Sequence, residues 1–353
     1  MDDTEAMHRA LALAAMVRGT TSPNPWVGCV IEAADGTVFQ GATDLPGGPH
    51  AEAAALAAAG DAARGATVWT TLEPCAHHGR TPPCAEALAA AGVRRVVVGI
   101  EDPDERVSGR GLETLRNAGI EVVVGVAADE VRRQLAPYVK QRTTGRPFVV
   151  LKLAASLDGR TAAPDGSSQW ITGGAARADT HRLRAESDAI IVGAGTVNAD
   201  DPSLTVRSVE GRDPLRVVLG TAPPEAKVHP ALEFSGELGD LLDELGRRGV
   251  LQALVEGGAQ VAGEFHRQGL VDHYTVYIAP ALFGGEDGRP LLAGPGAGTM
   301  ADVWRGRMIG VTRLGDDLRL DVEPAVPTAG TGPVPLVPPS VPLGTDDPPG
   351  PGR

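Results

Sequence analysis

The 353-residue sequence has few cysteines, few aromatic residues and no long apolar run. The three cysteines are Cys29, Cys75 and Cys84. A small and odd number of cysteines in a chain of this length does not suit a disulfide framework, which indicates a reducing compartment. No apolar stretch approaches the ~18 residues of a membrane span. The N-terminus is acidic before it is apolar, which is the wrong order for a secretory signal. We therefore expect a cytoplasmic protein without a membrane partner.

The chain also has little positive charge. Its 32 Lys and Arg residues stand against 45 Asp and Glu residues, a net charge of −13, which argues against a nucleic-acid partner. A local arginine cluster can still hold the phosphate of a small substrate inside an acidic protein. Hydrophobic residues make up 42% of the chain, an ordinary globular balance, and the length suits two domains.

Apolar runs alternate with helical patterns along most of the chain. In residues 1–145 the alternation predicts a layered α/β domain with a largely parallel sheet. The segment TTGRP (143–147) is the predicted boundary, after which residues 146–323 repeat the alternation and predict a second α/β domain. Residues 324–353 are rich in proline and almost lack large side chains, so we expect a disordered tail.

A first group of residues has the composition of a catalytic zinc site. His50, Cys75 and Cys84 supply three ligands, which leaves a fourth position for water. Glu52, two residues after His50, is placed to carry a proton from that water to a leaving amine. Zinc deaminases have HxE followed by PCxxC. Here Pro74 precedes Cys75 as expected, but eight residues separate the two cysteines, so the insert must loop out.

Two alternatives to a catalytic zinc remain open at this point. A structural zinc is one of them, because His77 or His78 could supply a fourth protein ligand. The cysteines could also be inert core residues, which is the reading we favour for Cys29 inside a predicted strand. Three ligands together with a suitably placed acid are harder to obtain by accident than any one of them.

A second group of residues lies in the C-terminal half. VGAGTV follows an apolar run, as a loop beside a cofactor pyrophosphate would, although such a glycine pair alone is weak evidence. Lys152 lies in an apolar strand, where an unpaired charge is costly unless the side chain points to solvent at an edge. Arg184 and Arg207 could grip a phosphate or simply lie on a helix surface.

These segments resemble a known family. HAE, TLEPCAHHGRTPPC, SPNPWVG and DPDERVSGRG resemble the deaminase half of the bifunctional riboflavin-biosynthesis deaminase/reductases. VVLKLAASLDGRTAAPDGSSQWIT, RLRAESDAIIVGAGTVNADDPSLTVR and LVEGGAQVAGEF resemble their reductase half. The resemblance implies a cytidine-deaminase-like three-layer domain followed by a dihydrofolate-reductase-like α/β domain.

The same resemblance implies the chemistry. Zinc-dependent hydrolysis would remove an amino group from 2,5-diamino-6-(5-phosphoribosylamino)pyrimidin-4(3H)-one, and NADPH would then reduce the ribosyl group to ribityl. The cofactors are Zn²⁺ and NADPH, and the partner is a small phosphorylated pyrimidine. We also expect a homo-oligomer.

The site residues follow residue by residue from the resemblance. His50, Cys75 and Cys84 would bind zinc with Glu52 as the proton shuttle. Lys152 and Asp200 are the polar groups expected nearest to hydride transfer. The expected substrate-binding residues are Asn24, His77 and Arg80 in the first half and Ser168, Arg184, Leu204, Arg207 and Glu256 in the second. The expected NADPH-binding residues are Ala154, Trp170, Thr196, Asp200, Thr221 and Gly258.

The chain departs from the family pattern at several positions. Arg80 replaces the usual lysine, Thr43 an often-found histidine, and Gly173 the usual serine. Residues 222–250 are shorter than in typical members and lack a recognisable strand and polar loop before their helix, which predicts a looser hold on NADPH. The alternative functions are an active deaminase joined to a non-catalytic reductase-like domain, and a zinc-stabilised binding protein without turnover.

Overall fold

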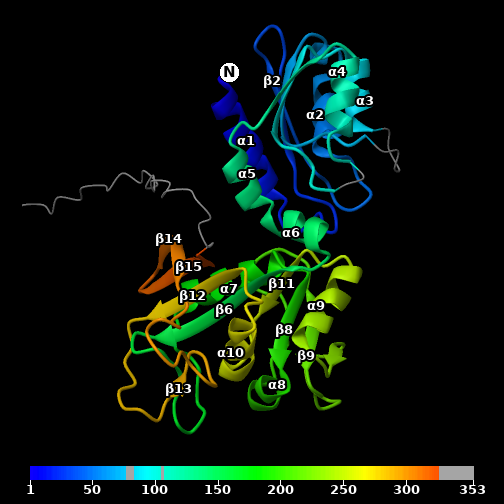
Figure 1. The fold of residues 1–353 in the computed structure, drawn as a ribbon. Coiled ribbons are helices and arrows are strands. Elements are labelled where there is room, and N and C mark those ends of the chain that lie inside the picture. The colour runs from blue at the N-terminus through cyan, green and yellow to red at the C-terminus, as the bar shows by residue number, and fades with distance from the viewer. Residues whose placement is uncertain (77–82, 105–106, 326–353) are drawn as a thin grey trace, which may run out of the picture.

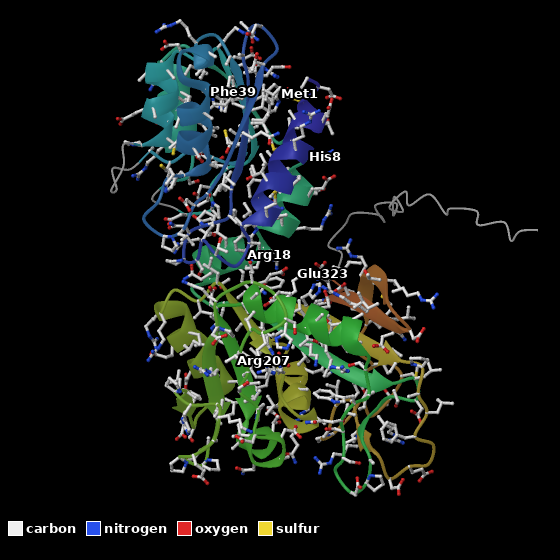
Figure 2. All side chains as sticks on the ribbon, turned by 180° about the vertical axis from the view of Figure 1, so that it is seen from behind. Met1, His8, Arg18, Phe39, Arg207 and Glu323 are labelled. Atoms are coloured by element: carbon white, nitrogen blue, oxygen red, sulfur yellow. The ribbon has the colours of Figure 1, made fainter. Side chains whose placement is uncertain are left out.

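The computed structural model describes residues 1–76, 83–104 and 107–325. Figure 1 shows two layered α/β units, the first coloured blue to cyan and the second green to orange, with α6 at their junction. Figure 2 shows the same arrangement from behind, with Arg18 near the junction and Arg207 in the second unit. In the part of the chain described, no helix combines the length and apolarity needed to cross a membrane.

The first sheet has five strands in the order β2-β1-β3-β4-β5. The strands are β1 (Gly28–Glu32), β2 (Val38–Ala42), β3 (Thr67–Leu72), β4 (Arg95–Ile100) and β5 (Glu121–Val124). β3, β4 and β5 are parallel, but β1 is antiparallel to both β2 and β3. The prediction of a largely parallel sheet is therefore wrong for this half, because the short link 33–37 allows only an antiparallel hairpin.

Helices cover both faces of this sheet. They are α1 (Asp3–Met16), α2 (Ala51–Ala59), α3 (Cys84–Ala91), α4 (Arg110–Asn117), α5 (Ala128–Gln134) and α6 (Ala136–Thr144), with a 3₁₀ turn η1 (Gly60–Ala63). In Figure 1, α1 and α5 lie on one face and α2, α3 and α4 on the other, the three layers that were expected. α5 and α6 are separated at Leu135. Pro137 explains the break, because its ring cannot continue the preceding helix.

The second sheet has eight strands in the order β10-β9-β8-β11-β6-β12-β15-β14. They are β6 (Phe148–Ser156), β8 (Ala189–Gly193), β9 (Leu215–Leu219), β10 (Leu232–Phe234), β11 (Gln252–Val255), β12 (His273–Ala279), β14 (Gly306–Leu314) and β15 (Asp317–Pro324). The pairs β12–β15 and β15–β14 are antiparallel and the others parallel. β7 (Arg160–Ala162) and β13 (Arg289–Pro290) form a separate ribbon.

Four helices belong to this sheet: α7 (Gly174–Ala185), α8 (Ala194–Asp200), α9 (Leu238–Arg247) and α10 (Ala259–Arg267). Two expectations need correction here. The VGAGTV segment is the end of β8 and the start of α8, not a loop. Residues 222–250 do contain a strand before their helix, because Leu232–Phe234 pairs with Val217–Leu219 as β10.

The apolar strands of the second sheet are buried on both faces. Every residue of β8 is buried, as are all four of β11. Their side chains divide between two hydrophobic cores, one around Ile191 and Phe265 and one around Ile190 and Tyr277. Burial on both faces explains why these strands read as continuous apolar runs in the sequence.

Asp321 on β15 provides a test of the electrostatics of this half. Its carboxylate lies 2.9 Å from His273 Nε2 and accepts a hydrogen bond of 2.9 Å from Arg319 Nε. Burial alone would raise the pKa of Asp321, but these hydrogen bonds outweigh it and lower the pKa from 3.8 to about 2. A carboxyl with a lowered pKa stabilises the fold above its unfolded pKa, and this stabilisation is lost as the pH falls through the folded pKa.

We expect Asp321→Asn to lower the free energy of unfolding by about 2 kcal/mol at pH 7. The difference from the wild type should shrink as the pH falls from about 4 to about 2, where the native carboxyl also becomes neutral. Urea unfolding at several pH values measures this. The matched control is Asp316→Asn, whose side chain is 89% exposed. A difference for Asp321→Asn that stays constant with pH would contradict the prediction.

Candidate zinc and reductase sites

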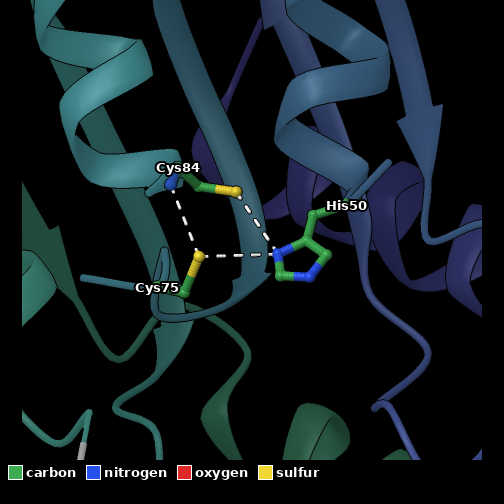
Figure 3. Close-up of side chains that lie close together, drawn as sticks. All are labelled: His50, Cys75 and Cys84. Carbon is green, nitrogen blue, oxygen red and sulfur yellow. Dashed lines mark hydrogen bonds between the residues drawn. The ribbon is translucent and has the colours of Figure 1, made fainter. Parts of the chain in front are cut away.

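Three side chains from separate elements converge at one end of the first sheet. His50 precedes α2, Cys75 follows β3, and Cys84 is the first residue of α3. His50 Nδ1 lies 3.5 Å from Cys75 Sγ and 3.4 Å from Cys84 Sγ (Figure 3). Ligands of one tetrahedral zinc lie about 3.5 Å apart, and zinc favours thiolate and imidazole. The three donors therefore fit this metal in type and spacing.

The start of α3 fixes the two cysteines relative to each other. The N–H of Cys84 donates to Cys75 Sγ at 3.4 Å. The helix begins directly after Pro83, so the eight-residue separation still allows both thiols to meet. Hydrogen bonds with the Cys84 thiol and His50 hold the pKa of Cys75 well below its usual range, despite its burial. A thiol with a low pKa is the thiolate that a metal requires.

Glu52 lies in the first turn of α2 and is 4% exposed. The hydroxyl of Thr70 on β3 donates to its Oε1 at 3.4 Å, and its carboxyl is hydrogen-bonded with the Cys84 thiol. Burial raises the pKa of Glu52 from 4.5 to about 7. A carboxyl with such a pKa exchanges a proton readily at neutral pH, which is what a general acid and base must do.

Sequence reasoning missed Glu73, which is 3% exposed. Its carboxylate holds the segment after β4 against the chain that leads to Cys75. It accepts the backbone N–H groups of Asp102 at 3.1 Å, Gly109 at 3.0 Å, Gly111 at 2.8 Å and Leu112 at 3.3 Å. Glu73 was visible only as part of TLEPC, and nothing in the sequence indicates which distant N–H groups it binds.

Asn24 and Thr43, two further positions of the deaminase half, form hydrogen bonds with the backbone near β1. Asn24 is half-buried in a turn before β1, where its N–H donates to Thr21 O at 2.9 Å. The Thr43 hydroxyl accepts the N–H of Val27 at 3.1 Å and is buried. His77 and Arg80 lie outside the described residues, as does His78.

In the second unit, three charged side chains form one buried cluster. Arg184 on α7 donates to both carboxylate oxygens of Glu256, at 2.7 and 3.0 Å. Lys152 Nζ lies 3.9 Å from Glu256 Oε2, and the three side chains are 13%, 8% and 19% exposed in the order Arg184, Glu256, Lys152. β6 is a central strand, so the edge-strand alternative for Lys152 is wrong. Burial lowers the pKa of Lys152, while Arg184 lowers that of Glu256 against the effect of its burial.

A short segment that contains Ser203 and Thr205 connects Arg207 with this cluster. The Arg207 guanidinium donates to Ser203 Oγ and to Thr205 Oγ1, the latter at 2.9 Å. Arg184 donates to the carbonyl oxygen of Thr205 at 3.3 Å, so both arginines contact one residue. The N–H of Arg207 donates to Nδ1 of His181, whose pKa is lowered by burial and by the two arginines. We missed His181, although its i,i+3 spacing from Arg184 places both on one face of a helix.

The other predicted reductase residues fall in three groups. The N–H of Gly258, at the start of α10, donates to Thr196 Oγ1 at 3.1 Å, which joins two expected cofactor residues. Trp170 is 69% exposed, and Arg177 Cζ lies 4.5 Å from its ring centroid. Leu204 is buried with a positive φ, Ala154 and Ser168 are half-buried, and Asp200 and Thr221 are exposed.

Gly173, where the family usually has serine, precedes α7. Its N–H donates to Asp317 Oδ2 at 2.7 Å, so a carboxylate from β15 binds the start of this helix. A Cβ added at Gly173 would lie 3.4 Å from that oxygen, an ordinary contact. The departure at Gly173 therefore leaves α7 anchored.

Both halves of the chain match family models. A family model described as the cytidine and deoxycytidylate deaminase zinc-binding region matches residues 1–100, and one described as the RibD C-terminal domain matches residues 147–320. Riboflavin biosynthesis protein RibD of Escherichia coli (strain K12) is 41% identical, over 91% of this chain and 99% of that protein. The chain belongs to the RibD family. Its members join a zinc-dependent deaminase to an NADPH-dependent reductase, so this chain is a bifunctional enzyme of riboflavin biosynthesis.

Solved structures support the same assignment. The structure of RibD from Acinetobacter baumannii matches with a TM-score of 0.86 and 40% identity, over 92% of this chain and 99% of that one. A diaminohydroxyphosphoribosylaminopyrimidine deaminase/5-amino-6-(5-phosphoribosylamino)uracil reductase from Thermotoga maritima matches with a TM-score of 0.82 and 33% identity, over 92% and 99%. The expected cytidine-deaminase-like and reductase domains are thereby confirmed.

Proposed function

We propose that residues 1–145 remove the 2-amino group of 2,5-diamino-6-(5-phosphoribosylamino)pyrimidin-4(3H)-one and that residues 146–323 reduce the ribosyl group of the product to ribityl. The observation that carries the first step is the convergence of His50, Cys75 and Cys84 beside a buried Glu52. An inert core alternative for the two cysteines fits poorly, because both thiols face the same imidazole nitrogen.

Glu52 is the proposed proton carrier of the deamination. Zinc, when held by His50, Cys75 and Cys84, lowers the pKa of a bound water molecule toward ~7. Glu52 accepts a proton at its carboxylate and later donates it to the departing amine, because burial brings its pKa to about 7. The hydrogen bond from Thr70 orients the carboxylate. We also propose that Asn24, His77 and Arg80 bind the pyrimidine and its ribose phosphate.

The charged cluster of the second unit is the proposed substrate-binding part of the reductase. The nicotinamide supplies the hydride chemistry, and the protein orients the substrate against it. Glu256 holds Arg184 in a fixed orientation, and Arg207 is free to bind an anionic group because its present partners are neutral hydroxyls. Ser168 and Leu204 complete the proposed substrate contacts, with Lys152 nearest to hydride transfer.

The proposed NADPH contacts lie on β6, on α8, at the start of α10 and in the loops before α7 and after β9. They are Ala154, Trp170, Thr196, Asp200, Thr221 and Gly258, of which Thr196 and Gly258 are hydrogen-bonded to each other. The exposed Trp170 offers a ring surface for stacking. Asp200 is exposed at the end of α8, and we propose that it reaches the hydride-transfer centre together with Lys152 when both ligands are bound.

We further propose a homo-oligomer in the cytoplasm that takes a small phosphorylated pyrimidine and no nucleic acid. Three free cysteines support a reducing compartment, since a disulfide would remove the metal-binding thiolates. The edge strand β14 supports self-association, because Met308, Ile309 and Val311 on it are exposed. Light scattering tests the oligomer, and a monomer at micromolar concentration would contradict it.

The function is tested by incubating the purified protein with the diaminopyrimidine phosphate and identifying the products by mass. Without NADPH we expect exchange of an NH group for oxygen together with ammonia release, and with NADPH a further gain of two hydrogens. Deamination without NADPH oxidation would favour a non-catalytic second domain. Absence of both reactions from zinc-loaded protein would favour a binding protein without turnover.

A further inference from the structure

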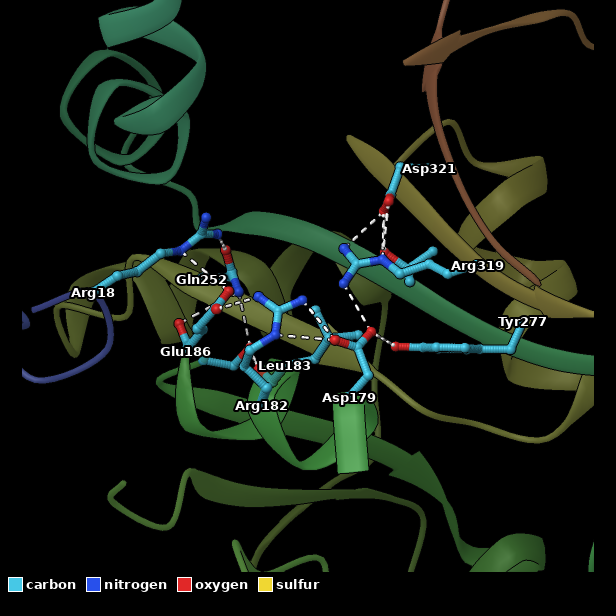
Figure 4. A network of polar contacts seen from close by, with 11 residues as sticks. Arg18, Asp179, Arg182, Leu183, Glu186, Gln252, Tyr277, Arg319 and Asp321 are labelled. Carbon is cyan, nitrogen blue, oxygen red and sulfur yellow. Dashed lines mark hydrogen bonds and ion pairs between the residues drawn. The ribbon is translucent and has the colours of Figure 1, made fainter. Parts of the chain in front are cut away.

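The turn after α1 belongs to the deaminase half but contacts the reductase half. Arg18 Nη2 donates to Oε1 of Gln252 at 3.0 Å, and Arg18 Nε lies 3.3 Å from Oε2 of Glu186. The guanidinium also lies over Trp26, 5.4 Å from the ring centroid. Figure 4 shows Arg18 reaching from the first unit into a polar network of the second.

A second and independent contact joins the same turn to the same place. Gly19 has a φ of +83°, and a Cβ added there would lie 2.3 Å from the carbonyl oxygen of Ala185 and 2.9 Å from the Cα of Glu186. The backbone of the turn therefore lies directly against the end of α7. Only glycine combines this left-handed conformation with so close an approach.

The two residues that Arg18 contacts belong to the elements that carry the proposed substrate-binding ion pair. Glu186 caps α7 two residues after Arg184, and Gln252 begins β11 four residues before Glu256. Gln252 is 2% exposed, and its side chain donates to the Ser187 hydroxyl at 3.0 Å. Arg18 thus fixes the end of α7 against the start of β11. Arg184 lies in the last turn of α7, and Glu256 directly follows β11.

The contacts continue along α7 toward Lys152. Glu186 accepts from Arg182 at 2.7 Å, and Arg182 donates to Asp179 at 2.7 Å. Asp179 accepts the hydroxyl of Tyr277 at 2.6 Å (Figure 4). Lys152 Nζ lies 5.8 Å from the Tyr277 ring centroid. A displacement of α7 would therefore move Arg184 directly and would disturb Lys152 through Asp179 and Tyr277.

We propose that Arg18, a residue of the deaminase half, is a positioning residue of the reductase. It holds α7 and β11 in the register that brings Arg184 onto Glu256. This rests on the proposed function, in which that ion pair binds the reductase substrate. The reductase domain accordingly depends on the attached deaminase domain for the geometry of its own site.

The test is Arg18→Ala in the full-length protein, with both activities measured on the same preparation. We expect kcat/KM of the reductase, assayed with the already deaminated substrate, to fall about tenfold, since small displacements of positioned groups have large kinetic effects. Ammonia release should stay at the wild-type level, which also reports correct folding of the first unit. Arg9→Ala, which removes an exposed pair with Glu5 on α1, is the matched control and should leave both activities unchanged.

Two further variants make the result specific. Arg18→Lys keeps the charge near Glu186 and should recover part of the loss. Combining Arg18→Ala with Glu186→Gln should cost less than the sum of the two single changes, because both remove the contact between Arg18 and Glu186. Equal losses of both activities, or unchanged reductase kinetics in Arg18→Ala, would overturn the proposal.

Arg184→Met in the same assay distinguishes failure of the Arg18 proposal from failure of the proposed function. Normal reduction by Arg184→Met would contradict the proposed function of the ion pair itself.

Discussion

Replacing Glu52 with glutamine is expected to lower the rate of ammonia release by about 10²–10⁴-fold, the usual contribution of a positioned general acid and base. Glutamine has nearly the same shape as glutamate but cannot take up and return a proton. The metal should remain, because His50, Cys75 and Cys84 are unchanged. Reduction of the already deaminated substrate should also remain, since it takes place in the second unit. Ammonia assays, metal analysis and NADPH oxidation measure the three quantities.

The matched control is Glu113→Gln, which changes an exposed glutamate in the first turn of α4. It should deaminate at the wild-type rate. If Glu52→Gln kept normal turnover, Glu52 would not be the proton carrier. If it lost its zinc as well as its activity, the carboxyl would have a structural role in the metal site, contrary to the assignment.

Replacing Arg184 with methionine is expected to affect both stability and reduction. Glu256 is 8% exposed and would lose both hydrogen bonds from Arg184, while Lys152 Nζ stays 3.9 Å away. Removing one partner of a buried ion pair typically costs about 3–5 kcal/mol in the free energy of unfolding. The reductase kcat/KM should fall by about 10²-fold, because the proposed substrate site loses a positioned cation. Urea unfolding and NADPH oxidation measure these effects.

Arg247→Met is the control for the loss of an arginine ion pair in the same unit. Its pair with Glu244 is a surface one, with Arg247 68% exposed, and should contribute no more than about 1 kcal/mol. Wild-type stability of Arg184→Met would show that Glu256 takes up a proton or a new partner. Wild-type reduction would show that the cluster lies away from the substrate.

The convergence of His50, Cys75 and Cys84 could be predicted because the information for it is local. HAE and Pro74-Cys75 fix residue types at short spacing, and Pro83 indicates where the next helix begins. The meeting of Cys84 with Cys75 then depends on α3 beginning at the end of the sheet where β3 ends. Glu73 could not be found in this way, because its four N–H donors lie 29 to 39 residues farther along the chain.

The reductase half was predicted less completely, for reasons of pairing and burial. The antiparallel hairpin β14–β15 has a mostly exposed first strand, so its sequence lacks the apolar run that marked the inner strands. The VGAGTV glycines read as a loop because they do not show that the chain enters α8 at once. The partner of Lys152 lies 104 residues away, which local spacing cannot reveal.

X-ray absorption at the zinc edge, on the purified full-length protein, tests the central assignment most directly. We expect two sulfur neighbours at about 2.3 Å and one imidazole nitrogen at about 2.0 Å, with one further light atom from water. Replacing Cys84 with serine should remove one sulfur from this shell. A second imidazole in the shell would instead indicate a closed structural site with a fourth protein ligand. That result, or a shell without sulfur, would contradict a catalytic zinc held by His50, Cys75 and Cys84.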